Sequence, residues 1–131
     1  MNPHYGNPFF PKSSRNCGSC ALAVEKRLSG DQTAKAHLKN IGKDEEMEAA
    51  TGKKCVYMSP ADIEAKVKSM GAGAHVIAGI NRQLPDGTRI SGHWFNIFYD
   101  GNKLYTLDGQ SGSIYGWPHD YQYISEWCIM I

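Results

Sequence analysis

The chain has 131 residues, of which 41% are hydrophobic and 21% charged, and its formal net charge is +1. A chain of this length forms one domain with a core of its own. The nearly neutral charge balance gives no reason to expect nucleic acid or an anionic membrane as a partner. No stretch reaches the roughly 18 apolar residues that a membrane-spanning helix needs.

The start of the chain, MNPHYGNPFFPK, has no basic region followed by an apolar core, so we expect no signal peptide of its own. Residues 1–15 are rich in Pro, Asn and Ser and are predicted to form an irregular arm. A single domain is predicted over residues 16–131. If the protein is exported, we expect a larger secretion system to carry it.

The first predicted helix covers residues 17–28, where apolar side chains recur at helical spacing. Asn16 is a suitable N-cap residue, and Gly30 follows as a stop signal. With Asn16 as the cap, Cys17 becomes the first residue of the helix.

Two more helical segments are expected. Residues 33–51 have a weak helical pattern that is interrupted near Gly42. The next helix is clearer, because Ser59 suits the N-cap, Pro60 the first position and Gly71 the end. Its buried stripe is predicted to consist of Ile63, Val67 and Met70.

After Gly73 the pattern changes to that of strands. The predicted strands cover residues 74–82, 92–100, 103–108, 111–117 and 123–131. The Asp-Gly pair at 100–101 is a strong signal for a two-residue hairpin turn. Helices followed by antiparallel strands predict an α+β domain, in which N-terminal helices pack on a C-terminal antiparallel sheet.

The four cysteines, at positions 17, 20, 55 and 128, are too few for a disulfide scaffold. One CxxC with two isolated cysteines also lacks the two ligand pairs of structural zinc, so no metal site is predicted. Unsatisfied N–H groups and the helix dipole favour a thiolate at a helix N-terminus. Cys17 has that position, whereas Cys20 lies one turn further in and faces the core. Cys17 is therefore the candidate nucleophile and Cys20 the alternative, against the ordinary interpretation of a packed apolar residue.

The hairpin suggests a base and its orienting partner. If the Asp-Gly pair forms a two-residue turn, paired residue numbers sum to 201, and His93 lies opposite Asp108. A four-residue loop shifts that sum to 203 and places His93 opposite Gln110. We favour the tight turn and Asp108. An imidazole held by a carboxylate is half of a nucleophilic triad, while the alternative is a surface pair of little energetic weight.

Three blocks of sequence occur in a recognisable order: RNCGSCALAVEKRLSG from residue 15, GHWFNIFYDG from residue 92 and LYTLDGQSG from residue 104. Together they resemble the papain-fold toxin domains described as glutamine deamidases, found at the C-termini of bacterial polymorphic toxins and effectors. The shared pattern is asparagine before the first cysteine, a strand with H-x-x-N, and a closing D-G-Q. Residues 31–90 carry no matching motif, so the resemblance does not transfer substrate choice.

The resemblance implies a papain-like cysteine-hydrolase fold. It also implies a catalytic triad of Cys17, His93 and Asp108, with Gln110 and Asn96 supporting the site.

The reaction that the resemblance implies is attack of the Cys17 thiolate on the side-chain carboxamide of a glutamine in a target protein. Ammonia leaves after protonation by His93, and water hydrolyses the thioester to give glutamate. The backbone N–H of Cys17, with the side chain of Asn16, would stabilise the oxyanion. This mechanism needs no metal and no organic cofactor.

Other functions stay open at this point. The same triad serves a cysteine peptidase, an amidase or a transglutaminase, since all pass through a thioester. From a different class, Cys17 and Cys20 would make a thioredoxin-like redox pair, although no apolar strand precedes them. An inactive binding domain is a further alternative.

The resemblance also implies partners and a location. We expect a target protein that bears the modified glutamine and a cognate immunity protein in the producing cell. The domain would be delivered into the cytoplasm of a target cell as part of, or by, a larger secretion system.

Overall fold

The computed structural model describes residues 17–31 and 43–131, where it has three helices and one six-stranded sheet. The domain is therefore α+β. The predicted arm over residues 1–15 lies outside the described residues. The helices are α1 (Cys17–Leu28), α2 (Asp44–Thr51) and α3 (Pro60–Ser69). The strands are β1 (Cys55–Tyr57), β2 (His75–Gln83), β3 (Arg89–Tyr99), β4 (Leu104–Asp108), β5 (Ser113–Gly116) and β6 (Ile124–Met130).

Helix α1 begins at Cys17 and ends before Gly30, as predicted. Gly30 has a φ of 111°, a conformation that glycine adopts readily, and its N–H donates to the carbonyl of Arg27 at 3.0 Å. The predicted N-cap, Asn16, lies outside the described residues. The first two turns of α1 are almost wholly buried, so this helix is fixed by packing rather than by helix propensity alone.

Helix α3 begins as predicted, because the Ser59 hydroxyl accepts a hydrogen bond from the N–H of Asp62 at 3.1 Å. Ile63 and Val67 are fully buried. The prediction for Met70 is wrong, since its side chain is 49% exposed. Met70 is the C-cap residue, where the chain leaves the helix and turns toward solvent.

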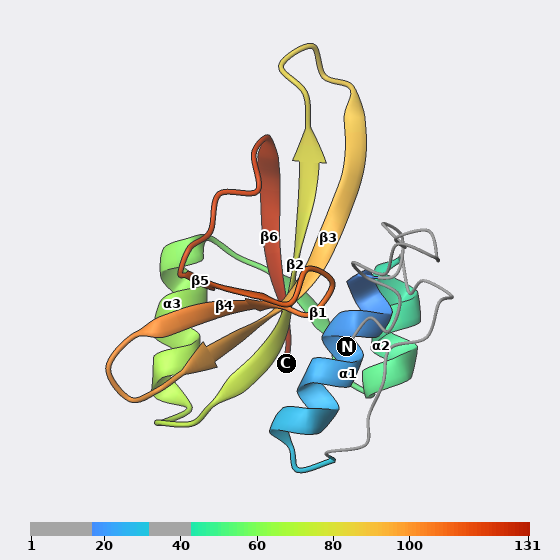
Figure 1. Ribbon diagram of the computed structural model, residues 1–131. Helices are drawn as coiled ribbons and strands as arrows, with labels where there is room; N and C mark the ends of the chain where they lie inside the picture. The colour runs from blue at the N-terminus through green and yellow to red at the C-terminus, as the bar shows by residue number, and fades with distance from the viewer. Residues whose placement is uncertain (1–16, 32–42) are drawn as a thin grey trace.

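The strand order is β1-β6-β2-β3-β4-β5, and all neighbours are antiparallel. Helices lie on both sides of this sheet (Figure 1). Ala21 of α1 and Met47 of α2 pack on one face against Ile77 and Trp94. On the other face, α3 packs against a core of strand residues: Val76, Ala78, Ile80, Phe95, Ile97, Leu104 and Ile129.

The register between β3 and β4 differs from the favoured prediction. Tyr99 pairs with Leu104, and Asn96 with Leu107, so residue numbers sum to 203 and the loop has four residues. The reason lies in the Asp100 side chain, whose Oδ1 accepts from the N–H groups of Asn102 at 2.7 Å and Lys103 at 2.8 Å. This side-chain turn replaces the tight Asp-Gly turn.

The pairing of β3 with β4 stops at Asn96 and Leu107, although both strands continue. Beyond this point β2 is the one partner of β3 among residues 17–31 and 43–131, while β4 turns into β5. We call this divergence of the two strands the fork. No described strand pairs with this edge of β3 beyond Asn96.

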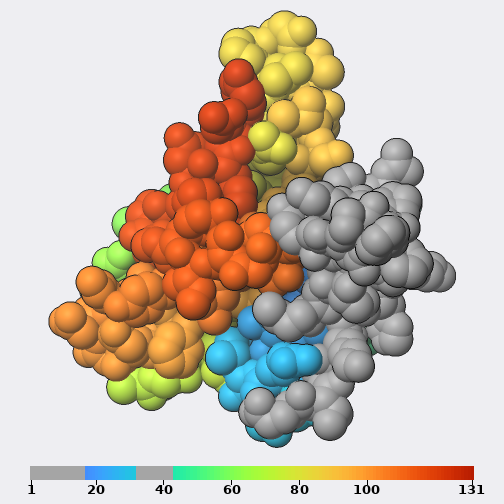
Figure 2. All heavy atoms as spheres, in the orientation of Figure 1, coloured from blue at the N-terminus to red at the C-terminus, as the bar shows by residue number. Residues whose placement is uncertain are grey.

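The turn after β4 lies directly against α1. A Cβ atom on Gly109 would meet Val24 Cγ2 at 2.7 Å and the carbonyl oxygen of Cys20 at 3.2 Å. Only glycine allows this approach, which brings the end of β4 to the helix that carries Cys17. Figure 2 shows the α1 residues in blue beside the orange residues of this region.

Candidate active site

The structure brings His93 and Asp108 together at the fork. His93 Nε2 lies 2.8 Å from Asp108 Oδ2, and the side chains are 14% and 6% exposed. The contact was predicted from a register that proves wrong, because His93 and Asp108 are not cross-strand partners. Instead Asp108, the last residue of β4, reaches back to β3 across the opening between the two strands.

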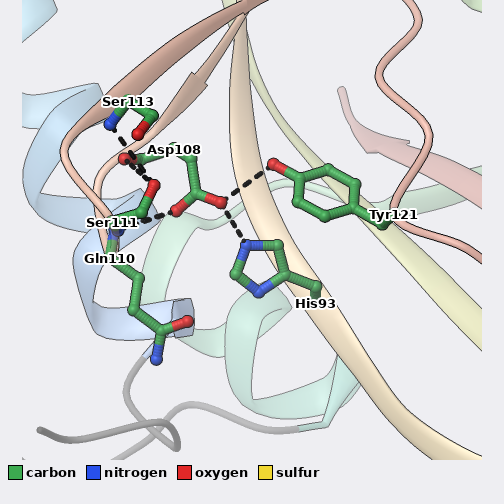
Figure 3. A network of polar contacts seen from close by, with 6 residues as sticks. All are labelled: His93, Asp108, Gln110, Ser111, Ser113 and Tyr121. Carbon is green, nitrogen blue, oxygen red and sulfur yellow. Dashed lines mark hydrogen bonds and ion pairs between the residues drawn. The ribbon is translucent and has the colours of Figure 1, made fainter.

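Both carboxylate oxygens of Asp108 accept further hydrogen bonds (Figure 3). Oδ1 accepts from the backbone N–H groups of Gln110 at 3.0 Å and Ser111 at 3.1 Å. Oδ2 accepts from the hydroxyl of Tyr121 at 2.9 Å as well as from His93. Burial acts to raise the pKa of Asp108, but these donors and the charge of His93 outweigh it and lower that pKa below its ordinary value.

Cys17 stands at the first position of α1 and is 6% exposed. It lines the same cavity as His93, and its side chain is near enough to the imidazole to raise the pKa of His93. Nε2 of the ring is engaged with Asp108, which leaves Nδ1 as the ring nitrogen outside that contact. Burial alone would lower the pKa of His93, but the hydrogen bonds with Asp108 and Cys17 raise it to about 9.

Cys20 has a different environment. It is 1% exposed and is not among the residues that line the cavity with His93. Burial raises the pKa of its thiol to about 12, so it keeps its proton at neutral pH. All four cysteines are free thiols, and Cys17 and Cys20 are not joined by a disulfide.

Two of the predicted supporting residues, Gln110 and Asn96, are among the described residues and lie in different places. Gln110 contributes its backbone N–H to Asp108, while its side-chain amide extends away from the carboxylate (Figure 3). Asn96 is fully buried away from the reacting groups, and its Nδ2 donates to the carbonyl of Ala21 at 3.0 Å, which fastens α1 to β3. Asn16 lies outside the described residues.

A cavity of about 260 Å³ opens at Cys17 and His93. The ring of Trp94 forms part of its wall, and it lies over Gly79, where a Cβ atom would meet the ring at 2.7 Å. Polar side chains line another part of the cavity: Asp44, Tyr57, Asn81 and Ser91. The hydroxyl of Tyr57 donates to Asp44 at 2.5 Å, so this polar wall is held by hydrogen bonds of its own.

Sequence reasoning missed Tyr121. It follows β5 and precedes β6, and its ring lies beside that of His93 with centroids 4.9 Å apart. No motif marks it, and 27 residues separate it from His93 along the chain. The D-G-Q block did signal the backbone donors, since Asp108 accepts from the N–H groups that follow Gly109.

Two structural features bear on other classes of function. Within residues 17–31 and 43–131, no three His, Cys, Asp or Glu side chains are grouped as metal ligands. None of the helices in these two segments is long and apolar enough to cross a membrane.

The family model described as papain fold toxin 1, glutamine deamidase, matches residues 15–113. The chain belongs to this family. The matched region of the papain fold toxin 1 family includes Cys17, His93 and Asp108 and ends before Tyr121. No curated protein and no solved structure matches the chain.

Proposed function

We propose that this member of the papain fold toxin 1 family converts a glutamine side chain of a target protein to glutamate, with Cys17 as nucleophile. The observation that carries the proposal is the placement of His93. Its Nε2 is held by Asp108, and it lines one cavity with Cys17, whose side chain raises the pKa of His93. This arrangement supports assigning Cys17 as nucleophile, His93 as base and Asp108 as the orienting carboxylate.

The first half of the reaction forms a thioester. The thiolate of Cys17, paired with protonated His93, attacks the carboxamide carbon of the glutamine. Negative charge develops on the carbonyl oxygen, where the N–H groups at the start of α1 stabilise it. The C–N bond then breaks as His93 gives its proton to the nitrogen, and ammonia leaves.

The second half consumes water. His93, now neutral, takes a proton from a water molecule as the oxygen attacks the thioester carbon. The C–S bond breaks, glutamate is released, and the proton returns the Cys17–His93 pair to its starting state. Asp108 stays a carboxylate throughout and keeps Nε2 of His93 protonated.

The size of the cavity supports a side-chain amide as substrate. Its volume of about 260 Å³ lies below the roughly 300–1,000 Å³ of pockets that take drug-sized ligands. A cavity of this size takes one side chain. A glutamine carboxamide stands at the end of a flexible side chain and reaches such a cavity directly, whereas a main-chain amide needs an open groove.

The partners follow from this function. We propose a protein substrate, delivery into the cytoplasm of a target cell by a larger secretion system, and a cognate immunity protein that protects the producing cell. Changing glutamine to glutamate introduces a negative charge into the target, which can disrupt a binding surface or a switch.

The proposal is tested with wild type and the Cys17→Ala and Cys20→Ala variants, incubated with cell extract in heavy-oxygen water. We expect wild type and Cys20→Ala to produce glutamates that carry one solvent oxygen, detected by peptide mass spectrometry, and Cys17→Ala to produce none. New peptide ends would instead indicate a peptidase, and glutamine–lysine cross-links a transglutaminase. Deamidation that persists in Cys17→Ala contradicts the proposed nucleophile.

A growth assay addresses the toxin proposal separately. Expression of wild type in a bacterium that lacks an immunity protein is expected to arrest growth, and expression of Cys17→Ala is not. Growth arrest that persists after removal of the Cys17 thiol would mean that toxicity does not depend on the triad.

A further inference from the structure

Tyr121 contacts two members of the proposed triad. Its hydroxyl donates to Asp108 Oδ2 at 2.9 Å, the same oxygen that accepts from His93 at 2.8 Å. Its ring lies beside His93 and packs on Phe95, with centroids 5.2 Å apart. The residue lies beyond the region matched by the family model, so the family pattern assigns it no role.

We propose that Tyr121 is a positioning residue, whose hydroxyl fixes the Asp108 carboxylate and limits how strongly that carboxylate stabilises the imidazolium form of His93. The inference rests on the triad of the proposed function. A second donor on Oδ2 withdraws negative charge from the atom that faces the imidazolium. His93 then gives up its proton more readily to the leaving ammonia.

The phenol is suited to this role because it stays a donor. Burial and the adjacent Asp108 carboxylate raise the pKa of Tyr121 far above its ordinary value. The hydroxyl is therefore protonated across the pH range in which the enzyme would work, and its charge does not change.

The backbone after Tyr121 points independently to a constrained position. Gln122 and Tyr123 have φ values of 68° and 57°, a left-handed conformation that costs energy for residues other than glycine. The side chain of Asp120 accepts from the N–H of Gln122 at 2.8 Å, and the guanidinium of Arg82 donates to the carbonyl of Gln122 at 3.0 Å. This strained, doubly anchored turn holds Tyr121 toward the fork.

The charged and titratable groups around His93 and Tyr121 come from three elements and one loop. Those that face His93 or Tyr121 among the described residues are Cys17 of α1, Asp108 of β4, Tyr115 of β5 and His119 after it. Tyr115 is the natural control, because it belongs to the same aromatic group, stacks on His119 at 3.7 Å and donates no hydrogen bond to Asp108.

The test is an NMR titration of the His93 ring in wild type, Tyr121→Phe and Tyr115→Phe, with His93→Gln used to assign the signal. Tyr121→Phe is expected to move the His93 midpoint upward by about half a pH unit or more, while Tyr115→Phe superimposes on wild type. The titration needs no substrate, so failure of deamidation leaves this result standing. Conversely, an unmoved midpoint overturns the role of Tyr121 and leaves the proposed reaction untouched.

Two further measurements separate positioning from a packing role. In an Asp108→Asn background, Tyr121→Phe is expected to cause no additional shift, because the carboxylate through which it acts is gone. A shift of the same size in both backgrounds overturns the proposal.

Fluorotyrosine placed at position 121 keeps the ring and makes the hydroxyl a stronger donor, so it is expected to move the midpoint of the His93 titration downward. That measurement does not depend on the folding of Tyr121→Phe, and an upward shift contradicts the proposal.

Discussion

Asp108 presents its two oxygens to different kinds of donor. Oδ1 faces two backbone N–H groups, which cannot rotate away, and Oδ2 faces the Tyr121 hydroxyl and His93 Nε2. A carboxylate satisfies all four donors at once. An amide at this position would have to place its oxygen toward the backbone and its NH₂ group toward His93.

Asp108→Asn therefore tests more than the loss of a charge. The NH₂ group would make His93 Nε2 an acceptor and leave the ring proton on Nδ1, the nitrogen needed by Cys17. We expect kcat for deamidation to fall on the order of a thousandfold, as for a triad held in the wrong tautomer. Asp86→Asn, in the loop between β2 and β3, is the control. A variant that retains a tenth of wild-type activity would show that the tautomer is not fixed in this way.

Among individual site residues, sequence analysis finds those that belong to a short motif or begin a helix. It misses residues that reach the site from a distant part of the chain. Cys17 follows from helix-start chemistry, and His93 and Asp108 occur in short motifs. Tyr121 has no such signal, because its role depends on a turn between β5 and β6 that sequence periodicity does not describe. The supporting role of Asn96 was implied by the family resemblance, and in the structure its Nδ2 donates to the carbonyl of Ala21 and joins β3 to α1.

At the scale of elements, the β4–β5 turn contacts α1 closely, so the end of β4, which carries Asp108, lies against the helix that carries Cys17. Gly109 makes this contact possible, since any side chain would collide with Val24 and Cys20. The D-G-Q block thus combines an orienting carboxylate with a packing glycine. A helix displaced here would carry Cys17 away from His93.

Gly109→Ala is expected to lower the free energy of unfolding by about 1–3 kcal/mol, as overpacking of a filled site does. Gly116→Ala is the matched control, because a Cβ atom there meets nothing within 4 Å. Urea unfolding measures the stability of both variants. Equal stabilities would mean that α1 yields to the new methyl group without cost.

Two element-level predictions failed for identifiable reasons. The four-residue loop replaces the tight turn because the Asp100 side chain accepts hydrogen bonds from two backbone N–H groups. An Asp-Gly pair is compatible with either loop. Strand β1 was missed because it has three residues between two helices and exists through pairing with β6 at the far end of the chain. In contrast, α1, α3 and the five later strands follow from caps and periodicity.

For the whole molecule, the raised pKa of His93 makes the free energy of unfolding depend on pH. Its pKa of about 9 in the folded protein exceeds the ordinary value of about 6.5, so folding favours its protonated form. The resulting stabilisation is fully present below about pH 6.5 and is lost as the pH rises through 9. The lowered pKa of Asp108 acts in the opposite direction, and its contribution disappears in acid.

We expect the free energy of unfolding of wild type to decline by about 3 kcal/mol between pH 6.5 and pH 9.5, as the displaced pKa of His93 requires. His93→Gln has no such group and is expected to show a much flatter profile. Urea unfolding at a series of pH values measures both. Parallel profiles for the two proteins would assign the decline to another group.

The four free thiols have a consequence for where this fold can exist. No disulfide joins the four thiols, so no covalent bridge contributes to the stability of this fold. Glutathione, which can reduce the disulfides of secreted proteins, finds no disulfide among these four cysteines. A protein delivered into the reducing interior of another cell, as we propose, would lose no disulfide there.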